Sequence, residues 1–243
     1  MVSMMLKVRA EGYHMKVKAW ILSIVFALAC TTVVRGVPDL QLDVSGGVYN
    51  WADETVYNST DPFTLYALAK TASTEGTSYY ISIAIVPKTS DTALPGFGSF
   101  SFGGTTYDAS SGWLFGVPPV DALIGDIPTH GLYPTLFLEV SFDKLDGFAE
   151  EYNSQDTPGG FSLYDGSGPS LGYKAFEVNT TSLGINYALH FDFYTYSEPG
   201  KVDAFAPFSH DAQTTRVPEG GATVALLGAA LAGIGILRRY LKV

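Results

Sequence analysis

Apolar and polar residues alternate, or form short apolar runs, along residues 37–215, and no helical period is sustained there. Runs of roughly four to eight residues separated by Gly, Pro, Asn and Ser are typical of β-strands and turns. The strands that we expect occupy residues 37–44, 48–51, 54–57, 63–68, 79–86, 96–104, 135–142, 171–178 and 186–196. We therefore predict an all-β fold, a single β-sandwich or jelly-roll-like domain.

Three stretches need separate interpretation. The phenylalanines of residues 96–104 alternate with small residues, so they form either an exposed aromatic ladder for sugar rings or one face of the core. We expect the core face. Residues 112–134 contain four prolines, which the centre of a sheet excludes, and we expect a long loop. The polar residues 143–160 are expected to form a second loop, with one helical turn at 147–152.

The N-terminal segment has the pattern of a secretory signal. A basic segment that begins at Met15, a candidate initiator, precedes an apolar run over residues 19–34. We expect signal peptidase to cut after Gly36, which makes residues 1–36 the signal peptide. Lipoprotein processing at Cys30 and an uncleaved N-terminal anchor are the alternatives.

The C-terminal segment, residues 217–243, combines a polar motif, an uncharged run and a basic end. As a helix, the run at 222–237 would rise roughly 24 Å, at about 1.5 Å per residue, a little less than a hydrocarbon core of about 30 Å. The arginines that follow can snorkel to the interface and favour the cytoplasmic side. We therefore predict a C-terminal transmembrane helix that leaves the preceding domain outside the cell.

This tail resembles the PEP-CTERM group of bacterial sorting signals. The resemblance is carried by Val217, Pro218, Glu219, Gly220, Gly221, Arg238 and Arg239. The two glycines make the tail more similar to the related VPDSG type, with Glu in place of Asp. The resemblance implies that a membrane enzyme of the exosortase type reads the tail, and a permanent single-span anchor is the alternative.

The domain between the two ends resembles the choice-of-anchor domains of bacterial surface proteins, specifically type N. Four segments carry this resemblance: Leu40–Asp43, Phe63–Ala67, His130–Gly131 with Tyr133–Thr135, and Phe205–Ala212. The resemblance implies a secreted, anchored domain and no established activity.

Charge is segregated along the chain. Residues 37–215 hold five lysines, no arginine and 22 of the 24 acidic residues, a net charge of −17. Binding to nucleic acid is excluded, because it needs basic side chains that neutralise phosphates. Such an acidic domain is suited to the outside of a cell or to attracting cations. The only cysteine, Cys30, precedes the domain, which excludes disulfides, zinc–thiolate sites and a cysteine nucleophile.

Two sets of side chains are candidate metal ligands. The first set is His190, Asp192, His210 and Asp211, a His/Asp combination that suits transition metals. The second set is Asp143, Asp146, Glu150 and Glu151, carboxylates of one polar loop that suit calcium. Hydrogen-bonded histidines and solvated carboxylates are the alternatives. We expect no obligatory cofactor, and calcium is the ion to test.

Catalytic motifs do not occur in the sequence: it has no Gly-x-Ser-x-Gly, His-Glu-x-x-His or P-loop segment. We expect a secreted, surface-sorted, non-catalytic protein of the bacterial envelope or extracellular matrix, structural or adhesive. Its expected partners are signal peptidase, an exosortase-type enzyme, the membrane and exopolysaccharide. A carbohydrate- or calcium-binding module and a secreted glycan hydrolase are the alternatives.

Overall fold

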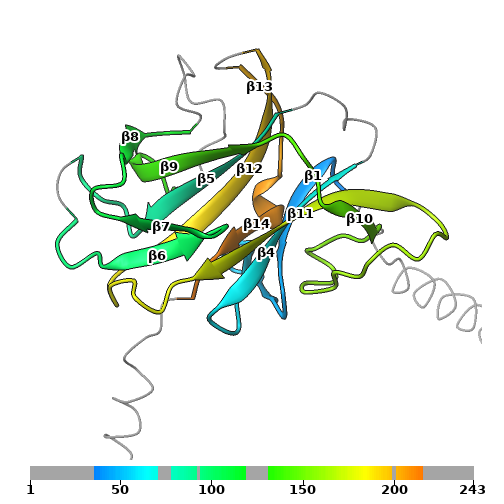
Figure 1. The fold of residues 1–243 in the computed structure, drawn as a ribbon, viewed down its shortest axis with the longest axis horizontal. Helices are drawn as coiled ribbons and strands as arrows, with labels where there is room; N and C mark the ends of the chain where they lie inside the picture. The colour runs from blue at the N-terminus through cyan, green and yellow to red at the C-terminus, as the bar shows by residue number, and fades with distance from the viewer. Residues whose placement is uncertain (1–35, 71–77, 92–93, 119–130, 199–200, 216–243) are drawn as a thin grey trace, which may run out of the picture. The chain divides into compact units, whose positions relative to one another are not determined.

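Short strands joined by turns make up the computed structural model of the chain, which describes residues 36–70, 78–91, 94–118, 131–198 and 201–215 (Figure 1). No α-helix occurs in these residues, so the all-β prediction is confirmed. The strands are β1 (Leu40–Val44), β2 (Val48–Asn50), β3 (Thr55–Tyr57), β4 (Phe63–Lys70), β5 (Tyr79–Val86), β6 (Ser99–Phe102), β7 (Thr105–Asp108), β8 (Leu114–Gly116), β9 (Thr135–Phe142), β10 (Gly147–Glu150), β11 (Ser170–Asn179), β12 (Ala188–Glu198), β13 (Lys201–Phe205) and β14 (Asp211–Gln213). A 3₁₀ turn, η2 (Phe208–His210), precedes β14.

The strands form two sheets. The first sheet has the order β1-β4-β11-β6-β7, and β10 also pairs with β11. The second sheet has the order β2-β3-β14-β12-β5-β9-β8, and β13 also pairs with β12. Strands that are distant in the sequence lie side by side, such as β5 and β12, which pair antiparallel from Tyr79 to Val86 (Figure 1). By contrast, β14 and β3 run parallel.

The two sheets share one buried core. The ring of Phe102 in β6 of the first sheet lies 6.0 Å from that of Phe191 in β12 of the second. Similarly, the rings of Phe142 and Phe176 lie 5.3 Å apart, although they belong to different sheets. Phe97, Phe100 and Phe102 are all buried in this core. The core interpretation of residues 96–104 is therefore confirmed, and the exposed aromatic ladder is wrong.

The polar positions of β1 are buried as deeply as its apolar positions. Gln41 and Asp43 are fully buried because residues 151–160, which we call the covering loop, pack over this face of the strand. Gln41 donates from Nε2 to the carbonyl of Tyr152 at 2.7 Å and accepts from the backbone N–H of Ser154 at 2.9 Å. Gly159 donates its backbone N–H to Asp43 Oδ1 at 2.8 Å. The buried side chains of Gln41 and Asp43 thus both have hydrogen-bond partners, as burial requires.

Two expectations about local structure are corrected. The helical turn expected at 147–152 is wrong, because residues 147–150 form β10, which pairs with the free side of β11. The loop expected at 112–134 begins with β8, which pairs with β9. Strands of three or four residues are too short to show a two-residue period, and the backbone partner decides their conformation instead.

The terminal predictions fall largely outside the described residues. The compact unit that contains the two sheets begins at Val37. Among the described residues, no helix has the length and apolar character needed to cross a membrane. The signal peptide except for Gly36, the polar sorting motif at 217–221, the run at 222–237 and the final arginines all lie outside the described residues. These assignments stay predictions.

Candidate metal centre

A cluster of polar side chains lies on the face of the second sheet that points away from the core. His190 and Asp192 are two residues apart on β12, so they share one face, whereas the intervening Phe191 enters the core. β14 pairs antiparallel with β12, with Gln213 opposite His190. Continuing this register by two residues brings Asp211 beside Asp192.

The imidazole of His190 lies between the two carboxylates. Its Nε2 is 3.5 Å from Asp192 Oδ1 and 3.6 Å from Asp211 Oδ2, and all three side chains are at most 4% exposed. The three donor atoms lie within 4.8 Å of one another. Among the described residues, this is the group of three His, Asp or Glu side chains that could hold a metal ion.

Hydroxyl groups orient the carboxylate of Asp192. Ser82 of β5 donates to Asp192 Oδ2 at 2.6 Å, and the hydroxyl of Tyr133 donates to the same oxygen. The backbone carbonyl of Tyr133 in turn accepts a 2.7 Å hydrogen bond from Lys88. Because Oδ2 receives both hydroxyls, the second oxygen, Oδ1, is turned toward His190. Oδ1 is buried and accepts no hydrogen bond from the described residues.

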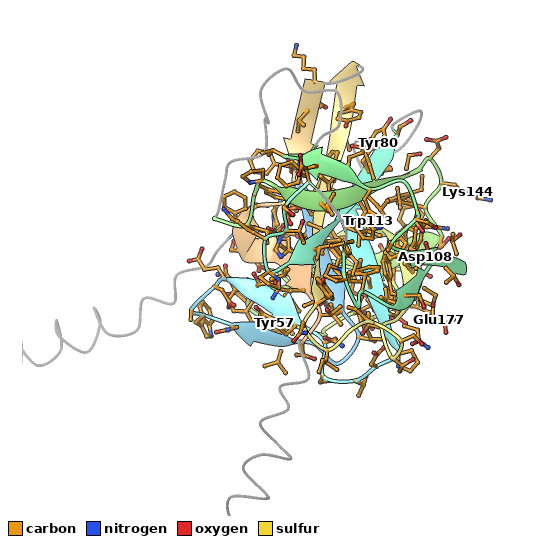
Figure 2. The ribbon with its side chains drawn as sticks, turned by 90° about the vertical axis from the view of Figure 1, so that its left-hand side faces the viewer. Tyr57, Tyr80, Asp108, Trp113, Lys144 and Glu177 are labelled. Atoms are coloured by element: carbon orange, nitrogen blue, oxygen red, sulfur yellow. The ribbon has the colours of Figure 1, made fainter. Side chains whose placement is uncertain are left out.

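A second chain of hydrogen bonds determines whether the other ring nitrogen of His190, Nδ1, carries a proton. Its Nδ1 lies 3.2 Å from Oε1 of Gln213. Gln213 donates from Nε2 to the hydroxyl of Tyr57 at 3.0 Å, and that hydroxyl donates to Asp53 at 2.6 Å. Tyr57, labelled in Figure 2, lies on the hairpin of β2 and β3. Since an amide oxygen only accepts, Nδ1 of His190 carries the proton.

Burial and charge pull the pKa values of the cluster in opposite directions. Burial favours the neutral form of His190, but the carboxylates of Asp192 and Asp211 outweigh it and raise the pKa to about 10. Burial also acts to raise the pKa of Asp192, but His190 and the two hydroxyls hold this pKa below its ordinary value. Burial and the charge of Asp192 raise the pKa of Asp211 well above its ordinary value. Two buried carboxylates that both face the same imidazole nitrogen therefore need a proton or another cation nearby.

One member of the cluster, His190, borders a pocket at the surface, whereas Asp192 and Asp211 do not line it. His190, although only 2% exposed, contributes to the wall of an open pocket of about 480 Å³. Asp53, Glu54 and Tyr57 line the same pocket. Its acidic side chains would attract cations from solution to this pocket.

His210, the fourth member of the first predicted set, lies outside this cluster. Its Nε2 lies 3.0 Å from Oδ1 of Asn153, and its Nδ1 lies 2.8 Å from the hydroxyl of Ser209. His210 ends the 3₁₀ turn and Asp211 begins the strand, so their side chains take different directions. His210 therefore connects the covering loop to β14, and the structure does not bring it together with the other three predicted ligands.

The acidic loop residues do not converge. Asp143, Asp146, Glu150 and Glu151 are all exposed, and none of them belongs to a three-ligand group among the described residues. Asp146 instead binds Lys174 at 2.6 Å and accepts the backbone N–H of Ala175 at 3.0 Å. Figure 2 shows Lys144, the neighbour of Asp143, extending outward from the domain. The prediction of a shared calcium site in this loop is not supported, and the interpretation as solvated charge fits the structure.

Three residues of the cluster were not among the predicted ligands: Ser82, Tyr133 and Gln213. Ser82 carries a weak signal in the sequence, because it is the hydroxyl-bearing residue within the otherwise apolar run of residues 81–86. Tyr133 and Gln213 carry no such signal, since each reaches the cluster through strand pairing that the pattern does not specify. The resemblances to sorting tails and choice-of-anchor domains stay predictions, because no protein-family model matches the chain and no curated protein or solved structure is significantly similar to it.

Proposed function

We propose that the chain is a secreted, non-catalytic protein of the bacterial cell surface, with a structural or adhesive role in the envelope or extracellular matrix. The observation that carries the proposal is the pairing of a secretory-type N-terminus with a tail of the sorting type, residues 217–243. Each pattern alone also fits a simple anchor. Together they describe a domain that is exported, held at the membrane and then passed on by an exosortase-type enzyme.

The described domain supports an extracellular location. Its net charge of −17 over residues 37–215 favours solubility and repels other acidic chains. We propose that its two sheets form a β-sandwich, because the ring pairs Phe102–Phe191 and Phe142–Phe176 join opposite sheets. Sandwiches of this kind serve many surface proteins as rigid spacers.

The surroundings of the buried histidine favour a structural role over a catalytic one. Both ring nitrogens of His190 face side chains of the protein, Gln213 on one side and two carboxylates on the other. A general base needs a nitrogen within reach of the proton that it abstracts from substrate. The adhesive partner that we propose is exopolysaccharide, and the exposed Trp51, 63% accessible beside Tyr49, offers an aromatic surface for sugar rings.

The delivery half of the proposal is tested by replacing both arginines of the tail, Arg238→Ser and Arg239→Ser, in a bacterium that has an exosortase. The unaltered chain should lose its C-terminal peptide and appear on the surface. The double variant should keep that peptide, detected by mass spectrometry, and stay in the membrane fraction. Lys201→Ser, which removes one exposed positive charge from the domain, is the control and should behave as the unaltered chain.

Two results would contradict the proposal in different ways. Surface delivery of the double variant at the level of the unaltered chain would show that the tail is not a sorting signal. An unaltered chain that keeps its C-terminal peptide in every fraction would show a permanent membrane anchor instead. A signal at residues 1–36 is tested separately by N-terminal sequencing of the exported chain.

A further inference from the structure

We propose that His190, Asp192 and Asp211 bind one divalent transition-metal ion of the Zn²⁺ class. The three side chains are buried, come from two adjacent strands and direct their donor atoms into one small volume. This site is independent of the delivery proposed above, because it depends only on contacts within the two-sheet domain.

The strand register creates the need for a cation. Asp192 on β12 and Asp211 on β14 lie beside each other on the same sheet face, and both are nearly inaccessible to water. Like charges that face each other across an antiparallel pair are destabilising, and burial increases this repulsion because water no longer screens it. A cation between the two carboxylates would convert the repulsion into attraction.

The tautomer of His190 leaves Nε2 with a lone pair that can bind a metal ion. The hydroxyl of Tyr57 gives its proton to Asp53, so it accepts from the amide nitrogen of Gln213. The amide oxygen of Gln213 consequently faces Nδ1, which must be the protonated nitrogen. In the neutral ring, Nε2 then directs its lone pair at two carboxylate oxygens. Three acceptors that face one another require a proton or a metal ion between them.

The carboxylate of Asp192 is also oriented for metal binding. The hydroxyls of Ser82 and Tyr133 occupy Oδ2, and they orient the carboxylate so that Oδ1 faces Nε2 of His190. Oδ1 accepts no hydrogen bond from the described residues, although the side chain is only 4% exposed. Hydrogen bonds to the atom of a ligand that does not touch the metal are the usual way in which proteins orient metal ligands.

The ligand types favour a transition-metal ion over calcium, and the two distances from the imidazole are compatible with it. Nε2 lies 3.5 Å and 3.6 Å from the two carboxylate oxygens, close to the edge of roughly 3.4 Å of a tetrahedron with bonds of about 2.1 Å. Calcium takes about six to eight oxygen ligands and does not favour imidazole. One nitrogen and two carboxylate oxygens instead suit Zn²⁺ and related ions, with one position left for water.

A bound proton is the competing explanation. An imidazolium at His190, ionised Asp192 and protonated Asp211 would also balance the charges of the cluster. The two cases differ in a measurable way, because only the metal site takes up one equivalent of Zn²⁺. Zn²⁺ would displace the proton from Nε2 and a second proton from Asp211.

The test uses the full chain, purified in mild detergent and treated with a chelator. Titration calorimetry with ZnCl₂ should show one site that depends on the cluster, and CaCl₂ should not compete for it. Co²⁺ bound in place of Zn²⁺ should give a visible absorption spectrum typical of four-coordinate cobalt. Zn²⁺ should also raise the unfolding temperature of the chain, because it binds the folded state.

Variants connect the binding to the cluster. His190→Gln should weaken Zn²⁺ binding more than about 100-fold, and Ser82→Ala, which removes an orienting hydroxyl, should weaken it by about 10- to 100-fold. His210→Gln, a buried histidine outside the cluster, should leave the affinity unchanged. The near-ultraviolet circular dichroism of each variant reports whether it is folded. If His190→Gln fails to fold, the comparison of Ser82→Ala with His210→Gln decides the question.

The proposal is overturned if the chelated chain binds no equivalent of Zn²⁺ while folded. It is equally overturned if folded His190→Gln, or Ser82→Ala where the former is unfolded, binds Zn²⁺ as tightly as the unaltered chain. Effective competition by Ca²⁺ would also overturn it, because the site would then be a calcium site. None of these results depends on whether the tail is processed.

Discussion

Tyr152 donates a 2.6 Å hydrogen bond to Oδ2 of Asp43, across a separation of 109 residues in the sequence. The other oxygen of Asp43 accepts the backbone N–H groups of Val44 and Gly159, each at 2.8 Å. The carboxyl thereby joins the covering loop to β1. Burial nevertheless raises the pKa of Asp43 to about 6, from 3.8, against the opposing effect of these hydrogen bonds.

The raised pKa of Asp43 predicts a component of stability that decreases as pH rises. The folded chain holds the proton up to about pH 6, whereas the unfolded chain releases it near 3.8. The contribution is therefore fully present below pH 3.8 and is lost as pH rises through 6, with a total of about 3 kcal/mol. Urea unfolding at pH 4, 5, 6 and 7, for the unaltered chain and Asp43→Asn, measures it.

The difference between the two chains isolates Asp43, because other titrating groups contribute to both. The unaltered chain should become less stable relative to Asp43→Asn between pH 4 and 7. A constant difference across this range would show that Asp43 has an ordinary pKa.

Removing the hydroxyl of Tyr152 should loosen the covering loop. Tyr152→Phe leaves the Oδ2 atom of buried Asp43 without its donor, and we expect a loss of about 1.5–3 kcal/mol in the free energy of unfolding at pH 7. Tyr164→Phe is the matched control, since that hydroxyl bonds the carbonyl of Gly168 at an exposed position. The control should change stability by less than about 0.5 kcal/mol. Equal urea midpoints for the two variants would contradict the assigned role of Tyr152.

A side chain at Gly98 should disrupt the contact between the segment before β6 and the turn at Ser182. A Cβ there would lie 2.1 Å from the carbonyl oxygen of Ser182, at a backbone φ of +73°. Gly96 has a similar φ of +70° and no atom within 4 Å of its Cβ position. Gly96→Ala thus isolates the backbone strain and should lower the free energy of unfolding by about 1–2 kcal/mol. Gly98→Ala adds the steric clash, so it should lower the free energy of unfolding by more than about 4 kcal/mol. Thermal unfolding compares them, and similar midpoints would refute the steric contact.

The aromatic contact between the two sheets should contribute much of the core stability. Phe102 is 2% exposed, and its ring lies 4.6 Å from Phe176 and 6.0 Å from Phe191. Phe102→Ala should cost about 3–5 kcal/mol, since a cavity remains between the sheets. Phe148→Ala, at a position that is 50% exposed, should change the urea midpoint little. A small effect at Phe102 would mean that the sheets can close over the cavity.

The longer strands could be predicted from the sequence, and the shorter ones could not. β4, β5, β9 and β12 have eight or more residues, enough for the two-residue period to appear. β10 and β14 depend instead on the backbone groups that neighbouring strands offer. The burial of Gln41 and Asp43 was also beyond the pattern, because alternation on β1 cannot show that a loop from residues 151–160 covers its polar face.

The candidate site was predictable where local geometry sufficed. The two-residue spacing of His190 and Asp192 places both on one strand face, and the structure confirms this. Asp211 was among the predicted ligands, but its approach depends on the register of a three-residue strand with β12. That register is set by tertiary packing, so the sequence pattern could not separate Asp211 from His210.

The position of β14 has a mechanical consequence. This last described strand lies between β3 and β12, so it is hydrogen-bonded along both sides. Beyond it, Thr214 donates its backbone N–H to the carbonyl of Leu189 at 2.8 Å, and Thr215 donates to Asn58 at 2.6 Å. Tension applied from the C-terminal side, along the strand, would load both ladders in shear at once rather than peel one bond at a time. A domain held by its C-terminal end would thus resist drag at its attachment point.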